Sequence, residues 1–489
     1  MPAEKPARAK KPVRADKPKP RADKPALPDR HFSCHEFCQW GKISLERLLA
    51  AAEHTCGEHP HNLCWSALQQ MNPVIVIPTY WTEASTPTST PASSTASSST
   101  AAATVASYDH ATPINQRRPE LEACLSSLDY VRGVMRVVVL VVAPPSCAKQ
   151  ARERVWSICA RHAVLNPLVI AAPEAQLISR SIAQLLPEMD GETVSLRGYG
   201  AIRNMGLAVA ALLGHDVVVF MDDDELALGP DYLVKAVYGI GRKTKQNHSL
   251  VAKTGYFLNY KDSPYATESD TAWYDKRWSK AQEFNDWMAR ALSTTRISRS
   301  NYACGGCMTL HAEAFMRIGF DPFITRGEDL DYLFNLRMYG FDMWFDNEWN
   351  VRHLPPPTPS QPSRFLQDVY RWEYERAKLA YASSKVELQQ VSPQSLMPYP
   401  GGWISDDLPK RTFWTSLFRA IGCPEHKAYL DIWLNGRTDA RTYAQQHKSS
   451  YLAFQTCWPL VMAQLWQHQQ LSEKILATGQ VYPRDIHVR

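Results

Sequence analysis

The sequence lacks the long apolar run that a membrane-spanning helix requires. Its longest such run, Val137–Pro145, is less than half of the roughly 20 residues needed to cross a bilayer. The first residues are charged and contain no apolar core of a secretory leader. We therefore expect a soluble, cytoplasmic protein without a transmembrane segment.

The sequence also lacks the regular cysteine pattern of a disulfide framework. Its eleven cysteines are odd in number and irregularly spaced, so we expect reduced thiols. Several of them lie with histidines between Cys34 and Cys64, in a segment (31–72) that also contains an amphipathic helical pattern. Thiolate and imidazole are ligands for zinc, but this spacing fits no standard zinc motif well. A zinc site and a small helical cap both remain open for this segment.

The chain after residue 30 lacks an excess of positive charge. Residues 1–30 contain ten Lys or Arg against four Asp or Glu, a net charge of +6, whereas the whole chain carries +5. The other 459 residues therefore sum to −1, which argues against a basic body that wraps nucleic acid. We expect the proline-rich tail to be disordered, and either solvated or in weak contact with RNA or an anionic membrane.

The remaining composition is that of a globular protein, with 45% hydrophobic and 21% charged residues. Residues 83–107 are mostly Ser, Thr, Ala and Pro, which predicts a disordered insertion. A proline-rich linker follows residue 355, and the chain beyond it has helical patterns without strand alternation. We predict a tail (1–30), a Cys/His-rich segment (31–72), a main domain (73–355) and a helical C-terminal region (356–489).

Within the main domain, short apolar strands alternate with amphipathic helices. Strands are expected at 73–80, 136–143, 168–171, 215–221 and 250–260, with helices near 118–128, 148–164 and 201–213. Strands that are apolar throughout are typical of a parallel sheet buried on both faces. The fold class is therefore α/β, and ligands are expected beyond the carboxyl ends of the strands.

One of these strands ends in the acidic run Asp222-Asp223-Asp224-Glu225. Four carboxylates at the mouth of an apolar strand are costly unless positive charge compensates them. A divalent cation provides that charge, because Mg²⁺ and Mn²⁺ prefer hard oxygen ligands. The structural alternative is a solvated turn that precedes the next helix.

Four further motifs accompany the acidic run in a fixed order. They are Arg203-Asn204 before it, and Cys304-Gly-Gly-Cys307, Arg326-Gly-Glu-Asp-Leu-Asp331 and Val351-Arg-His353 after it. This order resembles the GT-A glycosyltransferases, most of all glycosyltransferase family 2 and its close relatives, over roughly residues 73–355. The resemblance implies a Rossmann-like, mainly parallel sheet flanked by helices, and a hexosyltransferase-type enzyme that uses a nucleoside-diphosphate sugar.

The resemblance also assigns roles to individual residues. It implies Mn²⁺ or Mg²⁺ held by Asp222, Asp224 and His353, where the cation stabilises the departing diphosphate. The residues it implies for binding the donor are Pro78, Thr79, Tyr80, Arg203, Asn204, Asp222 and Asp223. His353 as a surface histidine and Arg203 as the partner of a structural carboxylate are the alternatives for these two side chains.

The acceptor side follows from the later motifs. The attacking hydroxyl must lose a proton, and the resemblance makes Asp329 the candidate base, with Glu328 orienting the acceptor or metal. Gly305, Gly306 and Trp273 are the expected acceptor-binding residues, for a glycan or a small molecule. The carboxylates of this motif also suit a helix N-terminus, which is their structural alternative.

Three hypotheses about function remain open from the sequence. The first is a metal-dependent glycosyltransferase that inverts the anomeric centre. The second is a retaining GT-A transferase or a sugar nucleotidyltransferase, which shares the metal-binding carboxylates but not the dedicated base. The third is a non-catalytic binding protein that keeps the transferase fold as a scaffold.

Overall fold

A computed structural model of the chain describes residues 68, 70–84, 108, 111–267, 272–355 and 361–482. The basic tail, the Cys34–Cys64 cluster and nearly all of the Ser/Thr-rich insertion, three features predicted from the sequence, lie outside the described residues.

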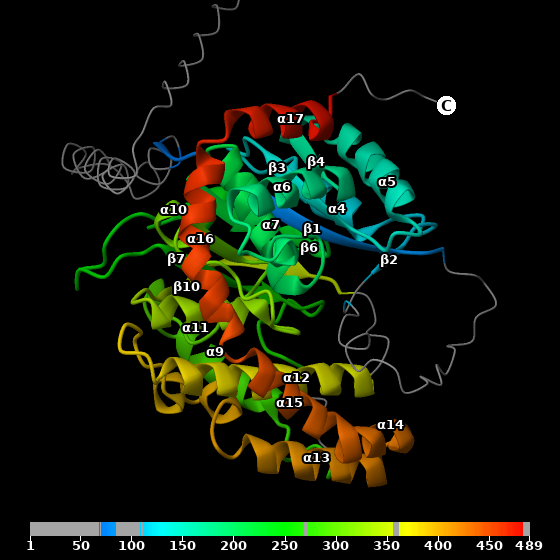
Figure 1. Ribbon diagram of the computed structural model, residues 1–489, viewed down its shortest axis with the longest axis vertical. Helices are drawn as coiled ribbons and strands as arrows, with labels where there is room; N and C mark the ends of the chain where they lie inside the picture. The colour runs from blue at the N-terminus through cyan, green and yellow to red at the C-terminus, as the bar shows by residue number, and fades with distance from the viewer. Residues whose placement is uncertain are drawn as a thin grey trace, which may run out of the picture.

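The strands of the described residues form one sheet of ten strands, in the order β4-β3-β1-β5-β9-β7-β10-β6, with β2 beside β1 and β8 beside β10 (Figure 1). Their bounds are β1 (Pro73–Thr82), β2 (Thr112–Pro113), β3 (Val137–Val142), β4 (Pro167–Ile170), β5 (Val217–Phe220), β6 (Glu225–Ala227), β7 (Ala252–Leu258), β8 (Ile297–Arg299), β9 (Met308–His311) and β10 (Met343–His353).

One half of the sheet is parallel and apolar on both faces. β1 pairs in parallel with β3 and β5, and β3 pairs in parallel with β4. Because side chains alternate along a strand, Val74 and Val76 enter the core on one face, and Ile75 and Ile77 enter the core on the other. A strand buried on both faces has to be a continuous apolar run, and this is the pattern seen in β1, β3 and β5.

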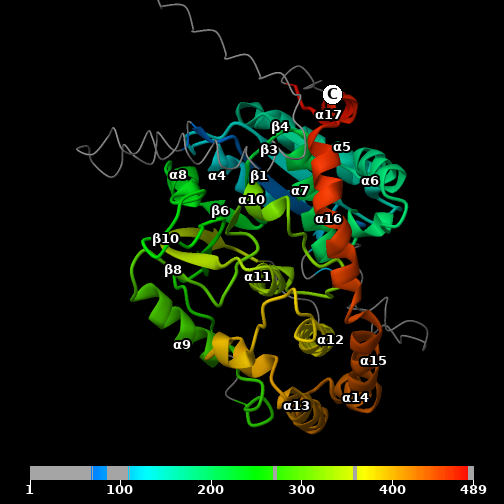
Figure 2. The same ribbon diagram turned by 60° about the vertical axis from the view of Figure 1, so that its left-hand side comes forward.

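Helices cover both faces. The first face is covered by α6 (Ala172–Leu185), α7 (Tyr199–Leu212), α10 (Ala312–Phe315), α11 (Glu328–Met338) and α17 (Gln469–Gly479). Outside them, α16 (Ser450–Trp466) packs on α6 and α7, and α12 (Gln361–Ala382) lies beyond α11 and packs on α15 (Arg437–His447) (Figure 2). The second face is covered by α4 (Glu120–Leu128), α5 (Ala148–Arg161), α8 (Tyr232–Val237) and α9 (Lys280–Leu292). This arrangement confirms the predicted α/β class with a mainly parallel sheet flanked by helices.

The other half of the sheet contains antiparallel strands that the sequence did not predict. β9 lies between β5 and β7 and is antiparallel to both. β6 and β8 are antiparallel to β10, whereas β7 is parallel to it. The antiparallel pair β6–β10 brings His353 opposite Glu225, so the end of β10 meets the acidic run.

The C-terminal region is helical, as predicted. Its remaining helices are α13 (Leu408–Gly422), α14 (His426–Asp431) and α15 (Arg437–His447), with short helical turns at Pro393–Leu396, Gly401–Trp403 and Ile432–Gly436. α16 runs from α15 back along the sheet, and α17 then lies over β4 (Figure 2). The last helices therefore share the core of the sheet instead of forming a separate one.

Across the described ranges, no helix combines the length and the apolar character needed to cross a bilayer.

Candidate active site

The acidic run forms the turn that joins β5 to β6, at the carboxyl end of the parallel strands. β5 ends at Phe220 and β6 begins at Glu225, so Asp222, Asp223 and Asp224 occupy the connection. The Asp222 side chain is about one-third exposed, whereas Asp223, Asp224 and Glu225 are buried. Most of the turn is therefore buried, and Asp222 is its most accessible carboxylate.

Arg203 joins this turn to the Glu328-Asp329 motif. α7 places the Arg203 guanidinium 2.8 Å from Asp222 Oδ1 through Nη2 and 3.1 Å from Glu328 Oε1 through Nε. Its side chain is only 6% exposed and lies over the Phe220 ring. Burial raises the pKa of Glu328, and Arg203 opposes that rise. One buried cation thus holds two candidate functional carboxylates at the same edge of the sheet.

Asp223 and Glu225 are oriented inward by hydrogen bonds. Thr79 Oγ1 donates to Asp223 Oδ2 at 2.6 Å, and the Asp222 backbone N–H donates to Glu225 Oε2 at 3.1 Å. Burial, together with the neighbouring carboxylates, raises the pKa of both Asp223 and Glu225 well above the ordinary range. The turn holds more carboxyl groups than its protein partners can stabilise in the ionised form.

Asp224 lies beside His353, and the role of the two residues as metal ligands stays a prediction. His353 Nε2 lies 3.3 Å from Asp224 Oδ2, and the Leu354 N–H donates to the Asp224 carbonyl oxygen at 3.0 Å. The His353 ring is partly exposed and also contacts the Phe257 ring edge to face. The last residue of β10 is therefore fixed beside the acidic turn.

The Gly305-Gly306 segment presses directly on these carboxylates. A Cβ on Gly306 would lie 2.0 Å from Glu225 Oε2, and one on Gly305 would lie 2.7 Å from Arg203 Nη2. The Gly305 N–H donates to Asp329 Oδ2 at 3.1 Å, and the Leu330 N–H lies 2.7 Å from Asp329 Oδ1. Glycine is needed at both positions because the backbone approaches the Arg203 and Glu225 side chains so closely that no Cβ atom fits.

Asp329 itself is partly exposed at the first turn of α11. The helix follows Gly327, whose φ of 71° lies in the left-handed region, and the Arg371 guanidinium packs where a side chain at 327 would be. Arg371 Nη2 also donates to the Gly327 carbonyl oxygen at 3.3 Å. Arg371 therefore fixes the entry of the chain into α11, and with it the position of Asp329.

Three tyrosines gather at the end of β1, of which the sequence analysis named only Tyr80. The Tyr80 ring lies 4.5 Å from that of Tyr108 and 6.2 Å from that of Tyr199. Tyr108 accepts a hydrogen bond from the Gly198 N–H at 3.0 Å. Tyr199 begins α7 four residues before Arg203, a spacing that puts it on the same helix face and offered a sequence signal for its proximity.

Other predicted residues lie deeper or elsewhere. Asn204 is fully buried. Its Nδ2 donates to the Thr193 and Phe320 carbonyl oxygens and its Oδ1 accepts from the Phe320 N–H, so both ends of its amide are hydrogen-bonded to backbone groups. Pro78 is buried within β1. Trp273 is half exposed, and its ring contacts Phe418 of α13, in the helical part of the molecule away from β1 (Figure 1). Its acceptor-binding role stays a prediction.

The oxygen and nitrogen atoms at this edge of the sheet are of the types that bind divalent cations. No group of three metal-ligating side chains is assembled among the residues that the structure describes. Two of the three predicted ligands, Asp224 and His353, do lie together, while Asp222 is paired with Arg203. Carboxylate oxygen and imidazole nitrogen suit Mn²⁺, and the buried negative charge of the turn favours a cation there.

Comparison with solved structures found matches at low sequence identity. The mannosyltransferase PcManGT from Pyrobaculum calidifontis, in complex with GDP-Man and Mn²⁺, is 14% identical with a TM-score of 0.38, covering 86% of this chain and 97% of its own. Glucosyl-3-phosphoglycerate synthase from Mycobacterium tuberculosis, in complex with Mg²⁺ and UDP, is 12% identical with a TM-score of 0.32, covering 61% and 77%. No curated protein sequence matches the chain.

The family comparison matches one continuous part of the sequence. The profile described as glycosyltransferase like family 2 matches residues 118–375, more than half of the 489 residues. The matched range contains the acidic turn, Arg203, the paired glycines, Glu328-Asp329 and His353. The chain belongs to the glycosyltransferase family 2-like proteins, and it is a glycosyltransferase.

Proposed function

We propose that this glycosyltransferase moves a sugar from a nucleoside-diphosphate sugar to a hydroxyl group of an acceptor, with inversion of the anomeric centre. The observation that carries the proposal is the ion-pair bridge made by Arg203 at the edge where the parallel strands end. The Arg203 guanidinium lies 2.8 Å from the Asp222 carboxylate and 3.1 Å from the Glu328 carboxylate. It sets the acidic turn, suited to the donor, beside the carboxylate motif suited to the acceptor.

On the donor side, the diphosphate needs positive charge as the sugar leaves. Asp222, Asp224 and His353 would hold a divalent cation, which supplies Lewis-acid stabilisation to the leaving group. Arg203, which already bonds Asp222, would form a charge-assisted hydrogen bond to a phosphate oxygen as a second partner. The tyrosines at 80, 108 and 199 offer aromatic faces near this edge for the nucleotide base.

On the acceptor side, Asp329 is the proposed general base. Its two carboxylate oxygens each have one backbone N–H nearby, from Gly305 and Leu330, and an ionised carboxylate keeps further lone pairs for a substrate proton. The acceptor oxygen forms the new bond to the anomeric carbon and its proton passes to Asp329. The bond to the diphosphate breaks, and the nucleoside diphosphate departs on the opposite side, which inverts the anomeric centre.

A thermal-shift panel tests the donor class. The full-length protein is titrated with UDP-, GDP-, ADP- and TDP-sugars, each with Mn²⁺, with Mg²⁺ and with EDTA. We expect one nucleotide to raise the melting temperature, more strongly with a cation than with EDTA, because the cation joins diphosphate to carboxylates. No shift and no donor hydrolysis with any nucleotide would contradict the proposal and favour a non-catalytic scaffold.

The role of Asp329 is tested by Asp329→Asn once the donor is known. We expect kcat to fall by roughly 10²–10⁴, with the donor-induced thermal shift preserved, because only the proton acceptor is lost. The matched variant Asp224→Asn should weaken donor and metal binding, and the exposed Asp262→Asn should change neither. Near-normal turnover of Asp329→Asn, or retention of the anomeric configuration by NMR of the product, would instead indicate a retaining transferase or a nucleotidyltransferase.

A further inference from the structure

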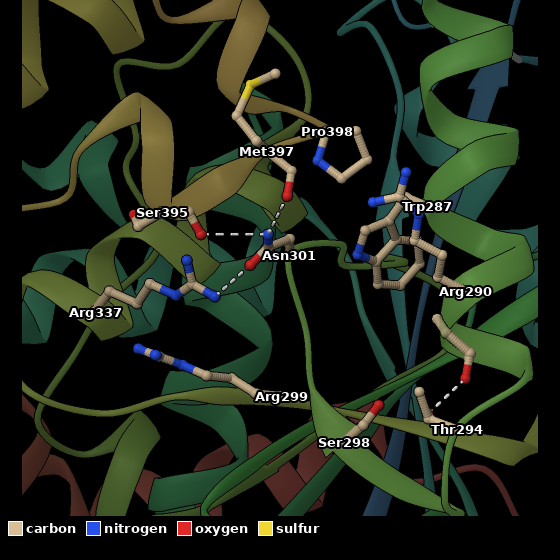
Figure 3. Close-up of a pocket in the computed structure, with 11 residues that line it drawn as sticks. Trp287, Arg290, Thr294, Ser298, Arg299, Asn301, Arg337, Ser395, Met397 and Pro398 are labelled. Carbon is tan, nitrogen blue, oxygen red and sulfur yellow. Dashed lines mark hydrogen bonds between the residues drawn. The ribbon is translucent and has the colours of Figure 1, made fainter.

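A cavity lies between α9, β8 and the last turn of α11. Its volume is about 260 Å³, and the segment 395–398 closes one side of it (Figure 3). This volume is slightly below the roughly 300–1,000 Å³ typical of sites for drug-sized ligands. The cavity is therefore of the size that suits a small polar metabolite.

The lining of this cavity is strongly cationic. Arg290, Arg299 and Arg337 contribute to it, and none of its eleven lining residues is acidic. Asp342 lies beside two of these arginines, 2.6 Å from Arg299 Nε and 3.8 Å from Arg337 Nε, whereas Arg290 forms no ion pair within the part of the chain that the structure describes. Three guanidinium groups against one carboxylate leave a surplus of positive charge.

Arg337 is the buried member of this cationic group. Its side chain is 6% exposed, and its Nε makes no hydrogen bond. Nη2 donates to the Ser300 carbonyl oxygen and to Asn301 Oδ1, both at 2.7 Å. Burial and the nearby Arg299 lower the pKa of Arg337 to about 10, a sign that its charge is incompletely balanced.

The other walls are apolar or hydroxyl-bearing. Trp287, Met397 and Pro398 form one side, and Thr294 and Ser298 lie below them (Figure 3). Arg299 and Arg337 form one half of the site, and Trp287, with Arg290 beside it on α9, lies on the other half (Figure 3). An anionic group suits the first half, and a compact carbon body suits the second.

The cavity is distinct from the candidate active site. None of its lining residues belongs to the acidic turn, the paired glycines or the Glu328-Asp329 motif. The Trp287 ring lies 5.2 Å from the Tyr302 ring at an interplanar angle of 43°, and the Tyr302 backbone leads into Cys304 and the glycines. Tyr302 and Trp287 therefore stand between the two sites.

We propose that this cavity binds a small phosphate ester, with the phosphate on Arg299 and Arg337, Arg290 adding positive charge from the opposite wall, and the organic body against Trp287, Met397 and Pro398. A phosphate dianion matches the planar donor fork of guanidinium groups and compensates their surplus charge. The proposal concerns a site beyond the donor and acceptor groups of the transfer reaction.

Calorimetric titration of the full-length protein tests the proposal with three probes: inorganic phosphate, glucose 6-phosphate and glucose. The titrations are run in the presence of saturating donor nucleotide and Mn²⁺, or of EDTA if no nucleotide binds, so that the acidic edge is not the measured site. We expect glucose 6-phosphate to bind at least tenfold more tightly than phosphate, and glucose not to bind.

The double variant Arg290→Gln/Arg299→Gln removes two exposed guanidinium groups and should weaken glucose 6-phosphate binding at least tenfold. The exposed Arg180→Gln on α6 removes one charge elsewhere and should leave binding unchanged. Trp287→Leu should weaken the ester and not inorganic phosphate. Failure of wild-type protein to bind the ester, equal binding of phosphate and ester, or unchanged binding in the double variant would each overturn the proposal.

Discussion

Gly306 shows how one residue type shapes the candidate active site. Glu225 is 2% exposed and accepts a hydrogen bond from the Asp222 N–H, so it braces the acidic turn from inside. All three nearest atoms to a Cβ at 306 belong to the Glu225 carboxyl group, at 2.0–2.4 Å. Any side chain at 306 would therefore have to displace the group that braces the turn.

We accordingly expect Gly306→Ala to destabilise the protein by about 1–3 kcal/mol, the usual cost of overpacking a buried site. Gly191→Ala is the matched control, because the nearest atom to its Cβ would be 4.0 Å away. Urea unfolding of both variants gives the two free energies of unfolding. Equal values for the two variants would show that Glu225 moves aside freely.

Single residues differed in how well the sequence predicted them. The acidic run and Glu328-Asp329 were identifiable, because carboxylates after an apolar strand and at a helix start stand out. The Arg203 bridge was not predicted as such, since pairing across 125 residues depends on the fold. Arg203 did carry a signal: it is a charged residue in an otherwise apolar helix, which requires a buried partner.

At the scale of elements, α12 is fixed to α11 by a buried ionic cluster. Lys378 Nζ donates to Asp321 Oδ2 at 2.8 Å, to Asp331 and to Asn335 Oδ1 at 3.0 Å. The side chains of Lys378, Asp321 and Asp331 are fully buried. Because α11 begins with Glu328-Asp329, this cluster also positions the helix that carries the candidate base.

Replacing the cation of this cluster should be costly. We expect Lys378→Met to destabilise the protein by about 3–5 kcal/mol at pH 8, because two carboxylates are left buried without a positive partner. Burial already raises the pKa of Asp331 to about 6, so protonation should reduce the loss at pH 5. Lys385→Met, just beyond α12, is the control and should cost under about 1 kcal/mol. A small effect of Lys378→Met at pH 8 would contradict this interpretation.

The start of α10 provides a prediction about pH. His311 Nδ1 accepts a hydrogen bond from the Glu313 N–H at 3.2 Å, and burial lowers its pKa from 6.5 to about 4. Between these values the unfolded chain binds more protons than the folded one, so stability falls as pH drops from 6.5 towards 4.

His311→Asn keeps a side-chain acceptor at this position and removes the titration. Urea unfolding at pH 7 and at pH 4.5 gives the free energy of unfolding that each protein loses on acidification. We expect this loss to be roughly 1–3 kcal/mol smaller in the variant than in wild type. The exposed His248→Asn variant is the control and should follow wild type. Identical pH dependence in all three proteins would rule out His311 as a contributor.

Elements were predictable where a long apolar run or a clear helical pattern existed. The strands β1, β3 and β5 and the helix α7 lie where the sequence placed them, because burial on both faces demands continuous apolar residues. β9 was missed because a run of four residues has too little periodicity to be distinguished. Its position between β5 and β7 is set by pairing of distant segments.

At the scale of the whole molecule, the end of the described chain covers the edge strand of the sheet. Gln480 Nε2 donates to the Pro167 carbonyl oxygen at 3.1 Å, and the Val481 N–H donates to the same oxygen at 3.1 Å. Leu471 and Ile475 of α17 are buried in the core beside it. Covering an edge strand in this way blocks unwanted pairing with other chains.

A chain that ends at Gln467 should therefore be both less stable and prone to aggregate. Loss of Leu471 and Ile475 alone removes on the order of 3–6 kcal/mol of apolar burial, and β4 becomes an open edge. A chain that ends at Tyr482 keeps α17 and should match the full-length protein in soluble yield and melting temperature. Equal behaviour of the two truncations would show that α17 is dispensable.

Contact between the two ends of the fold also has a consequence for biosynthesis. Gln480 bonds Asn166 across 314 residues, so β4 leaves the ribosome long before the segment that covers it. At roughly 5–20 residues per second, the β4 edge waits about 15–60 s for its partner. During that interval the nascent sheet presents an unpaired strand edge, which is the kind of surface that pairs with other unfolded chains.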